Sequence, residues 1–218
     1  MTIFIIFYLI CLFSYFFTRD MGLRIRCINK YLLAGMYLSL AFFFLFQNGG
    51  LGSRKDLLLA GLSLCFLGDV FLVFDFLRGG DFFFAGNLCF IFYEMGVLVR
   101  HKEALIWLIV PFLAAVSAAL CFFLLTKKLF IKKKKENMLY PMAMYLCAIL
   151  LDGLLGLLLM IFVKDGSCLR MGMGTFLFMI SDLILTTYKF IIRENNLWLI
   201  RLNSLTYFPG LLLIVLAM

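Results

Sequence analysis

Charged residues make up only 15% of this 218-residue sequence, whereas hydrophobic residues make up 65%. A soluble globular domain of this length carries about 25% charged residues, because its surface must stay hydrated. The shortage of charge therefore excludes a soluble globular protein and predicts a chain that lies in lipid. No stretch is polar and long enough for a separate soluble domain, so we expect a single transmembrane domain over residues 1–218.

Residues that usually bind metals are also scarce. The single histidine, His101, lies in a hydrophilic connection. This excludes a multi-histidine zinc or di-iron site and leaves any Ser-His-Asp triad dependent on one residue at the membrane surface. The seven cysteines form no CxxC pair, which favours reduced, inert thiols. The acidic residues show no spacing typical of a Mg²⁺ or Ca²⁺ site. We therefore expect carboxylate chemistry, with no metal and no cofactor.

Charges and turn residues divide the chain into eight apolar runs. A spanning helix needs roughly 20 apolar residues, and lipid offers no partner for an unpaired backbone amide, so each run is predicted to be a helix. The first run has no basic segment before it and no small-residue cleavage site after it, which indicates a helix rather than a removable signal peptide. The expected fold class is all-α, a polytopic membrane bundle of about eight transmembrane helices, near residues 2–17, 31–47, 57–76, 82–99, 104–126, 138–163, 171–190 and 197–217.

Lysine and arginine predict the orientation of the bundle. Fourteen of the twenty basic residues lie in or beside the first, third, fifth and seventh connections. The positive-inside rule places these connections in the cytoplasm, so both termini are predicted to face outward. The basic block at residues 127–135 lies between two runs, which favours contact with anionic membrane lipid over a nucleic-acid partner. Short connections indicate a multi-pass protein of a bacterial cytoplasmic membrane, and the oligomeric state stays open.

An internal repeat singles out two aspartates. Residues 61–72 (GLSLCFLGDVFL) align without gaps on residues 174–185 (GTFLFMISDLIL), and the glycine, two leucines and the aspartate coincide. The repeated runs are four apart and therefore run in the same direction, as in a parallel duplication of a four-helix unit, with halves of about 1–103 and 104–218. Asp69 and Asp182 are then predicted to lie at one depth in the bilayer.

A charged residue in the centre of a membrane helix costs roughly 2.5–3.5 kcal/mol, so such residues normally face the interior of a bundle and act there. We expect Asp69 and Asp182 to meet across one cavity and to share one proton, which gives one acid and one base. Small residues precede both, Gly68 and Ser181, and Ser181 is also a candidate hydrogen-bonding group of the site. In the alternative interpretation, each aspartate only joins helices through polar contacts.

These motifs resemble the YhhN/TMEM86 family of membrane proteins, whose characterised members are lysoplasmalogenases. The resemblance rests on residues 61–72, on FFFAGNLCFIF (82–92) and on MGMGTFLFMISDLILTTYKF (171–190), and it covers most of the chain from Lys30 onward. It implies a lysophospholipid substrate, whose sn-1 vinyl ether is hydrolysed to a fatty aldehyde and a glycerophospho-ethanolamine or -choline. Protonation of the β-carbon of such an ether creates an oxocarbenium ion that water captures. One aspartate is expected to supply the proton while the other stabilises the cation.

The sequence departs from the family pattern at four positions. Glu94 stands where the family usually has histidine, and Asp152 where it tends to have methionine. Leu211 replaces an expected glutamine, and Tyr31 replaces a proline. Glu94 is expected either to join a proton relay or contact the head group, or else to be a solvated interfacial carboxylate. Asp152, near the centre of the sixth run, is expected to face inward.

Further residues are candidates for a supporting role. Lys30 fits the lysine of the family and is expected either to meet the substrate phosphate or to extend its ammonium group to the membrane surface. Tyr145 and Tyr207 are candidates for the cavity wall, and the alternative is packing or anchoring at the interface. Asn87 is a further cavity candidate.

Two other functions fit the same sequence. A proton-coupled transporter also contains repeated units and buried carboxylates, but no two helices in corresponding positions are broken by glycine or proline. A catalytically silent, lipid-binding member of the family is the third interpretation, motivated by the departures at Glu94 and Leu211. Release of fatty aldehyde from a lysoplasmalogen distinguishes the enzyme from both.

Overall fold

The computed structural model describes residues 2–18, 23–47, 55–101, 104, 106–132, 136–187, 189 and 196–218. Over these ranges the chain forms eight α-helices and one short 3₁₀ helix, and it contains no strand. The prediction of an all-α helix bundle is confirmed. The elements are α1 (Thr2–Thr18), α2 (Leu23–Gln47), α3 (Lys55–Phe71), α4 (Phe76–Leu98), η1 (Ile106–Leu108), α6 (Ile109–Lys132), α7 (Glu136–Phe162), α8 (Gly166–Thr186) and α9 (Leu197–Val215).

Six of the helices in the described part of the chain are long and apolar enough to cross a membrane. The other two, α1 and α3, have 17 residues each. Such a helix is about 26 Å long, somewhat less than the roughly 30 Å of a hydrocarbon core. The polytopic membrane architecture therefore holds; α1 agrees with its predicted run of 2–17 to within one residue, whereas α3 is three residues shorter than the predicted run of 57–76.

Capping aspartates explain where two helices begin. The Asp75 side chain accepts hydrogen bonds from the backbone amides of Leu77 and Arg78, which starts α4 at Phe76 rather than near residue 82. Asp165 caps α8 in the same way, so that helix begins five residues before the predicted run. The predicted run 57–76 was too long at its end, because residues 72–75 form the turn before α4 and Phe76 already belongs to α4.

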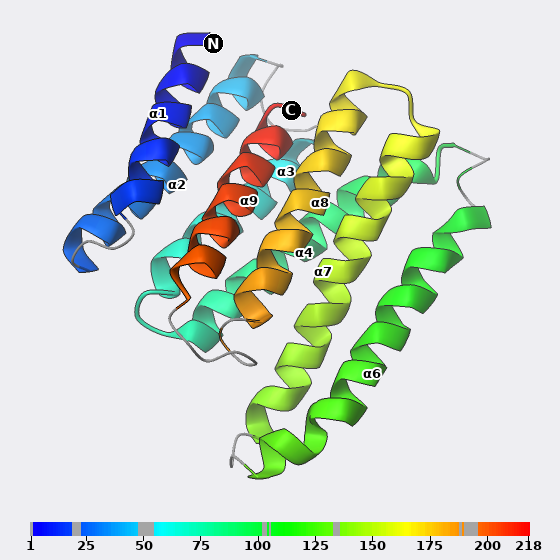
Figure 1. Ribbon diagram of the computed structural model, residues 1–218. Helices are drawn as coiled ribbons and strands as arrows, with labels where there is room; N and C mark the ends of the chain where they lie inside the picture. Colours follow the sequence, from blue (N-terminus) through cyan, green and yellow to red (C-terminus); the bar gives the residue numbers. More distant parts are fainter. Residues whose placement is uncertain are drawn as a thin grey trace.

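Figure 1 shows a broad bundle with α1 and α6 at opposite edges and α9 and α8 between them. Helix α9 packs against α8, α2, α1 and α3, whereas α4 packs against α3 and α7. Helix α6 packs against α7 and exposes most of its apolar surface, as expected of a helix that faces lipid. The start of α1 and the end of α9 lie at the same end of the bundle, and the side of the membrane that this end faces stays a prediction.

The helix contacts follow the pattern that the predicted duplication would produce. In the predicted duplication, α2, α3 and α4 correspond to α7, α8 and α9. The packed pair α3–α4 then corresponds to the packed pair α8–α9. The packed pair α2–α9 likewise corresponds to the packed pair α7–α4. A Cβ atom on Gly86 would lie 3.1 Å from the carbonyl oxygen of Gly61, and one on Gly210 would lie 2.9 Å from that of Gly174. Matching glycines therefore allow close contact in α3–α4 and α8–α9. The duplication itself stays a prediction.

Candidate active site

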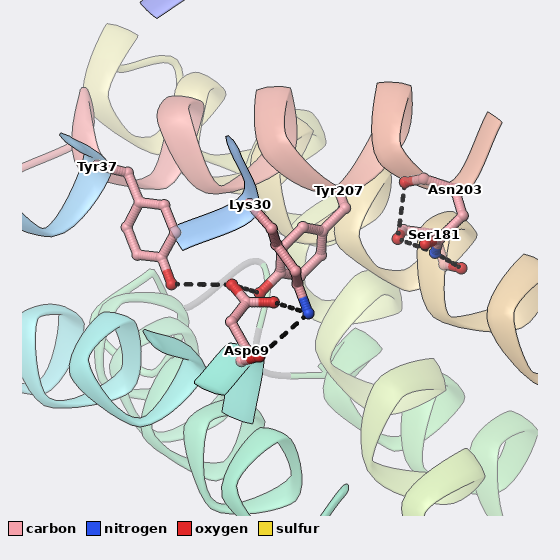
Figure 2. Close-up of polar contacts among 6 residues, drawn as sticks. All are labelled: Lys30, Tyr37, Asp69, Ser181, Asn203 and Tyr207. Carbon is pink, nitrogen blue, oxygen red and sulfur yellow. Dashed lines mark hydrogen bonds and ion pairs between the residues drawn. The ribbon is translucent and has the colours of Figure 1, made fainter. Parts of the chain in front are cut away.

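Asp69 lies two residues before the end of α3 and is 1% exposed. The Lys30 Nζ atom is 3.0 Å from its Oδ1 atom, and the Tyr207 hydroxyl donates to Oδ2 over 2.8 Å. The Tyr37 hydroxyl donates to the same oxygen over 3.4 Å, so partners from α2 and α9 converge on one carboxylate (Figure 2). Lys30 is 14% exposed and paired. Of the two roles expected for Lys30, neither accounts for this ion pair with Asp69, and both stay predictions.

Asp182 lies four residues before the end of α8 and is 3% exposed. The Tyr145 hydroxyl on α7 donates to its Oδ2 atom. Among the residues that the structure describes, no lysine or arginine forms an ion pair with it. A tyrosine on the preceding helix in the predicted repeat thus donates to each aspartate, but within the described ranges only Asp69 also pairs with a cation.

The two aspartates line one small cavity, whose wall also has residues from α1, α2, α4 and α9. Its volume is about 50 Å³, which is room for one or two water molecules. The hydrogen bonds of the described side chains do not join the two carboxyl groups directly, so sharing of one proton by the pair stays a prediction. The remaining wall consists of Tyr15, Lys30, Leu72, Phe83, Leu185, Asn203, Ser204, Tyr207 and Phe208.

Ser181 precedes Asp182 and fixes α8 against α9. The Asn203 side-chain amide donates to the Ser181 hydroxyl and to its carbonyl oxygen, each over 2.8 Å (Figure 2). The Ser181 hydroxyl in turn donates to the Asn203 carbonyl oxygen over 3.2 Å. Ser181 is fully buried, and its bonds hold the residue beside Asp182 in place rather than forming part of the cavity wall.

Glu94 on α4 and Asp152 on α7 form a second carboxyl pair, 0% and 1% exposed. The two carboxyl groups are in contact, and the Thr175 hydroxyl donates to Glu94 Oε1 over 2.9 Å. No N–H or O–H group of the described residues donates to Glu94 Oε2 or to either Asp152 oxygen. The groups can therefore bond to each other only through a proton held between them. Because Glu94 is fully buried, its interpretation as a solvated, interfacial carboxylate is wrong. Asp152 is buried too, so the prediction that it faces inward is confirmed.

Two other residues differ from the sequence-based picture. Asn87 is fully buried, but its amide donates to the Phe83 carbonyl oxygen of its own helix, and it does not line the cavity of the two aspartates. Tyr37 is a partner of Asp69 that the sequence interpretation missed. It follows Lys30 by seven residues, which is two helical turns, so the shared helix face was a usable signal.

The fold and the site together define a polytopic membrane protein with buried carboxylate centres. The chain belongs to the YhhN family, whose sequence model matches residues 26–218, and the resemblance inferred from the motifs is thereby confirmed. Among curated proteins and among solved structures, none matches this chain.

Proposed function

We propose that the protein is a membrane-embedded hydrolase that cleaves the sn-1 vinyl ether bond of lysoplasmalogens. The observation that carries the proposal is that two buried aspartates, Asp69 on α3 and Asp182 on α8, line a single cavity. Hydrolysis of an enol ether needs an acid at the β-carbon and a negative group beside the developing cation. It needs no nucleophilic serine and no metal, so this pair suits the reaction. Membership of the YhhN family supports the same chemistry.

The partners of the two aspartates suggest different roles. Lys30 and two tyrosine hydroxyls all stabilise the ionised form of Asp69, so we assign it to the stabilisation of the oxocarbenium ion. Asp182 accepts a bond from Tyr145 on Oδ2, and its Oδ1 atom is free of hydrogen bonds from described residues, so we assign Oδ1 to carry the proton.

The reaction then balances without a further reagent. Asp182 gives its proton to the β-carbon, and water adds to the oxocarbenium carbon. The proton lost by that water returns to Asp182. The resulting hemiacetal breaks its bond to the glycerol oxygen, which takes the hydroxyl proton, and the products are the aldehyde and the glycerophospho alcohol. Lys30 lines the cavity beside Asp69, and we propose that it also attracts the substrate phosphate.

The test is turnover of purified protein in lipid nanodiscs. Asp69→Asn and Asp182→Asn are each expected to lower the rate of aldehyde release at least about 100-fold while the protein stays folded. Asp56→Asn is the matched control, because this residue lies on α3, 13 positions and about 20 Å from Asp69. Wild-type protein that releases no aldehyde, or near-normal rates in both variants, overturns the proposal.

A proton-coupled transporter is the second candidate, and the Glu94–Asp152 pair is the observation that favours it. The pair can hold a proton, yet it does not line the cavity of the two other aspartates. Buried carboxyl pairs of this kind form proton pathways in carriers. Uptake of lysophospholipid into vesicles that follows a pH gradient, without aldehyde release, would support this candidate. Binding without uptake or aldehyde would support the silent, lipid-binding member.

A further inference from the structure

An apolar groove of about 300 Å³ lies beside the cavity of the two aspartates, between α4, α6, α7 and α8. The groove and the cavity share three wall residues, Leu72, Phe83 and Leu185. Tyr145 also lines the groove, and its hydroxyl donates to Asp182 in the cavity. One end of the groove therefore adjoins the cavity that Asp69 and Asp182 line.

The wall of the groove suits hydrocarbon rather than a polar head group. It consists mainly of aliphatic, aromatic and methionine side chains from spanning helices. Tyr140 and Met144 on α7 are 66% and 61% exposed, so the groove opens on the face of the bundle that meets lipid. A ligand can thus enter sideways from the bilayer.

We propose that this groove holds the single alkyl chain of an amphiphile whose polar end lies at Asp69 and Asp182, with Gly80 setting the length of chain that fits. The proposal rests on the proposed function for the identity of the polar end. The volumes agree with it, because the cavity of about 50 Å³ admits a reacting bond but no chain, whereas the groove is six times larger. The groove is also at the small end of the range for ligand pockets, which fits one chain better than two.

Gly80 is a wall residue of the groove with room for a larger side chain. It lies in the groove wall, and a Cβ atom added there would meet no atom within 4 Å. The adjacent Gly79 is different, because a Cβ atom there would lie 2.8 Å from the backbone of Leu72. A side chain at position 80 therefore occupies space that a ligand would use, without forcing helices apart.

The experiment measures binding, separately from turnover. Native mass spectrometry compares the affinity of wild type and variants for lysophospholipids with saturated sn-1 ether chains of increasing length, which lack the vinyl ether bond. Gly80→Leu is expected to shift the preference to chains shorter by several carbons, with affinity for longer chains falling roughly fourfold for each methylene displaced. Gly35→Leu is the matched control, because a Cβ atom there also meets nothing within 4 Å and the residue lies on α2, away from the groove.

A second variant covers the case in which Gly80→Leu does not fold. Phe122→Ala removes a ring from the α6 side of the wall and is expected to move the preference to longer chains. An unchanged length profile in a folded variant overturns the groove assignment, and so does a wild type that binds all lengths equally. A shifted profile without aldehyde release from lysoplasmalogens leaves the groove assignment intact and overturns the proposed hydrolase instead.

Discussion

Lys30→Met keeps the unbranched apolar part of the side chain but removes the charge that lies 3.0 Å from Asp69. Two unit charges at this separation attract by about 5.5 kcal/mol at an effective dielectric constant of ~20. Lys30 is 14% exposed and Asp69 is 1% exposed, so water screens the pair only weakly. Tyr37 and Tyr207 still donate to the carboxylate and recover part of the loss. We therefore expect the substitution to lower the free energy of unfolding by about 3 kcal/mol.

A double-mutant cycle isolates this pair. Lys30→Met, Asp69→Asn and the double variant are unfolded by sodium dodecyl sulfate in mixed micelles. Unfolding is followed by thiol labelling of Cys65, which is fully buried one turn before Asp69. The coupling free energy is expected to be about 2–3 kcal/mol, with the double variant more stable than the sum of the single effects predicts.

The exposed pair of Arg78 and Asp75 is the matched control for this cycle. Its atoms lie 3.4 Å apart, and the side chains are 72% and 44% exposed. Arg78→Met with Asp75→Asn should show coupling below about 1 kcal/mol, because water screens the charges and asparagine still caps α4. A coupling free energy for Lys30 and Asp69 as small as that of this surface pair would refute the reasoning. Charges that water screens weakly should attract each other more strongly than exposed ones.

Two further substitutions test the other contacts. Asp152→Asn supplies an N–H donor to Glu94 Oε2, an oxygen to which no described residue donates, and is expected to stabilise the protein by about 1–3 kcal/mol; a lower denaturation midpoint would contradict this. Tyr145→Phe removes the hydroxyl that donates to Asp182 and is expected to slow aldehyde release by about 10-fold to 100-fold. An unchanged rate in that variant, measured beside an inactive Asp182→Asn, would show that the hydroxyl does not orient the acid.

Hydropathy and the repeat predicted the class of fold and drew attention to Asp69 and Asp182, because burying a charge in lipid is costly enough to stand out in a sequence. The helix starts were predicted less well. Asp75 and Asp165 look like ordinary loop residues until the backbone amides that they cap are placed. In an apolar chain, periodicity gives little help with such boundaries, because both faces of a spanning helix are hydrophobic.

Contacts between side chains of different helices were beyond the sequence. Glu94 and Asp152 could each be noticed as an acid in an apolar run, but nothing in either run says that α4 packs against α7. The pairing of Lys30 with Asp69 likewise depends on how α2 lies against α3. A hydropathy pattern gives the number and direction of spans, whereas these pairings depend on which helices are neighbours.

Glycine contacts between helices help to position Asp69 and Asp182. Gly61 and Gly174 each stand eight residues before their aspartate, about 12 Å along the helix axis. A Cβ atom at Gly61 would meet the ring of Phe90 on α4, and one at Gly174 would meet Ile214 and the Gly210 carbonyl oxygen on α9. The position of Asp69 relative to α4, and that of Asp182 relative to α9, is thus held by contacts that have no side-chain atoms on the glycine side, and such contacts are less adjustable than those between two long side chains.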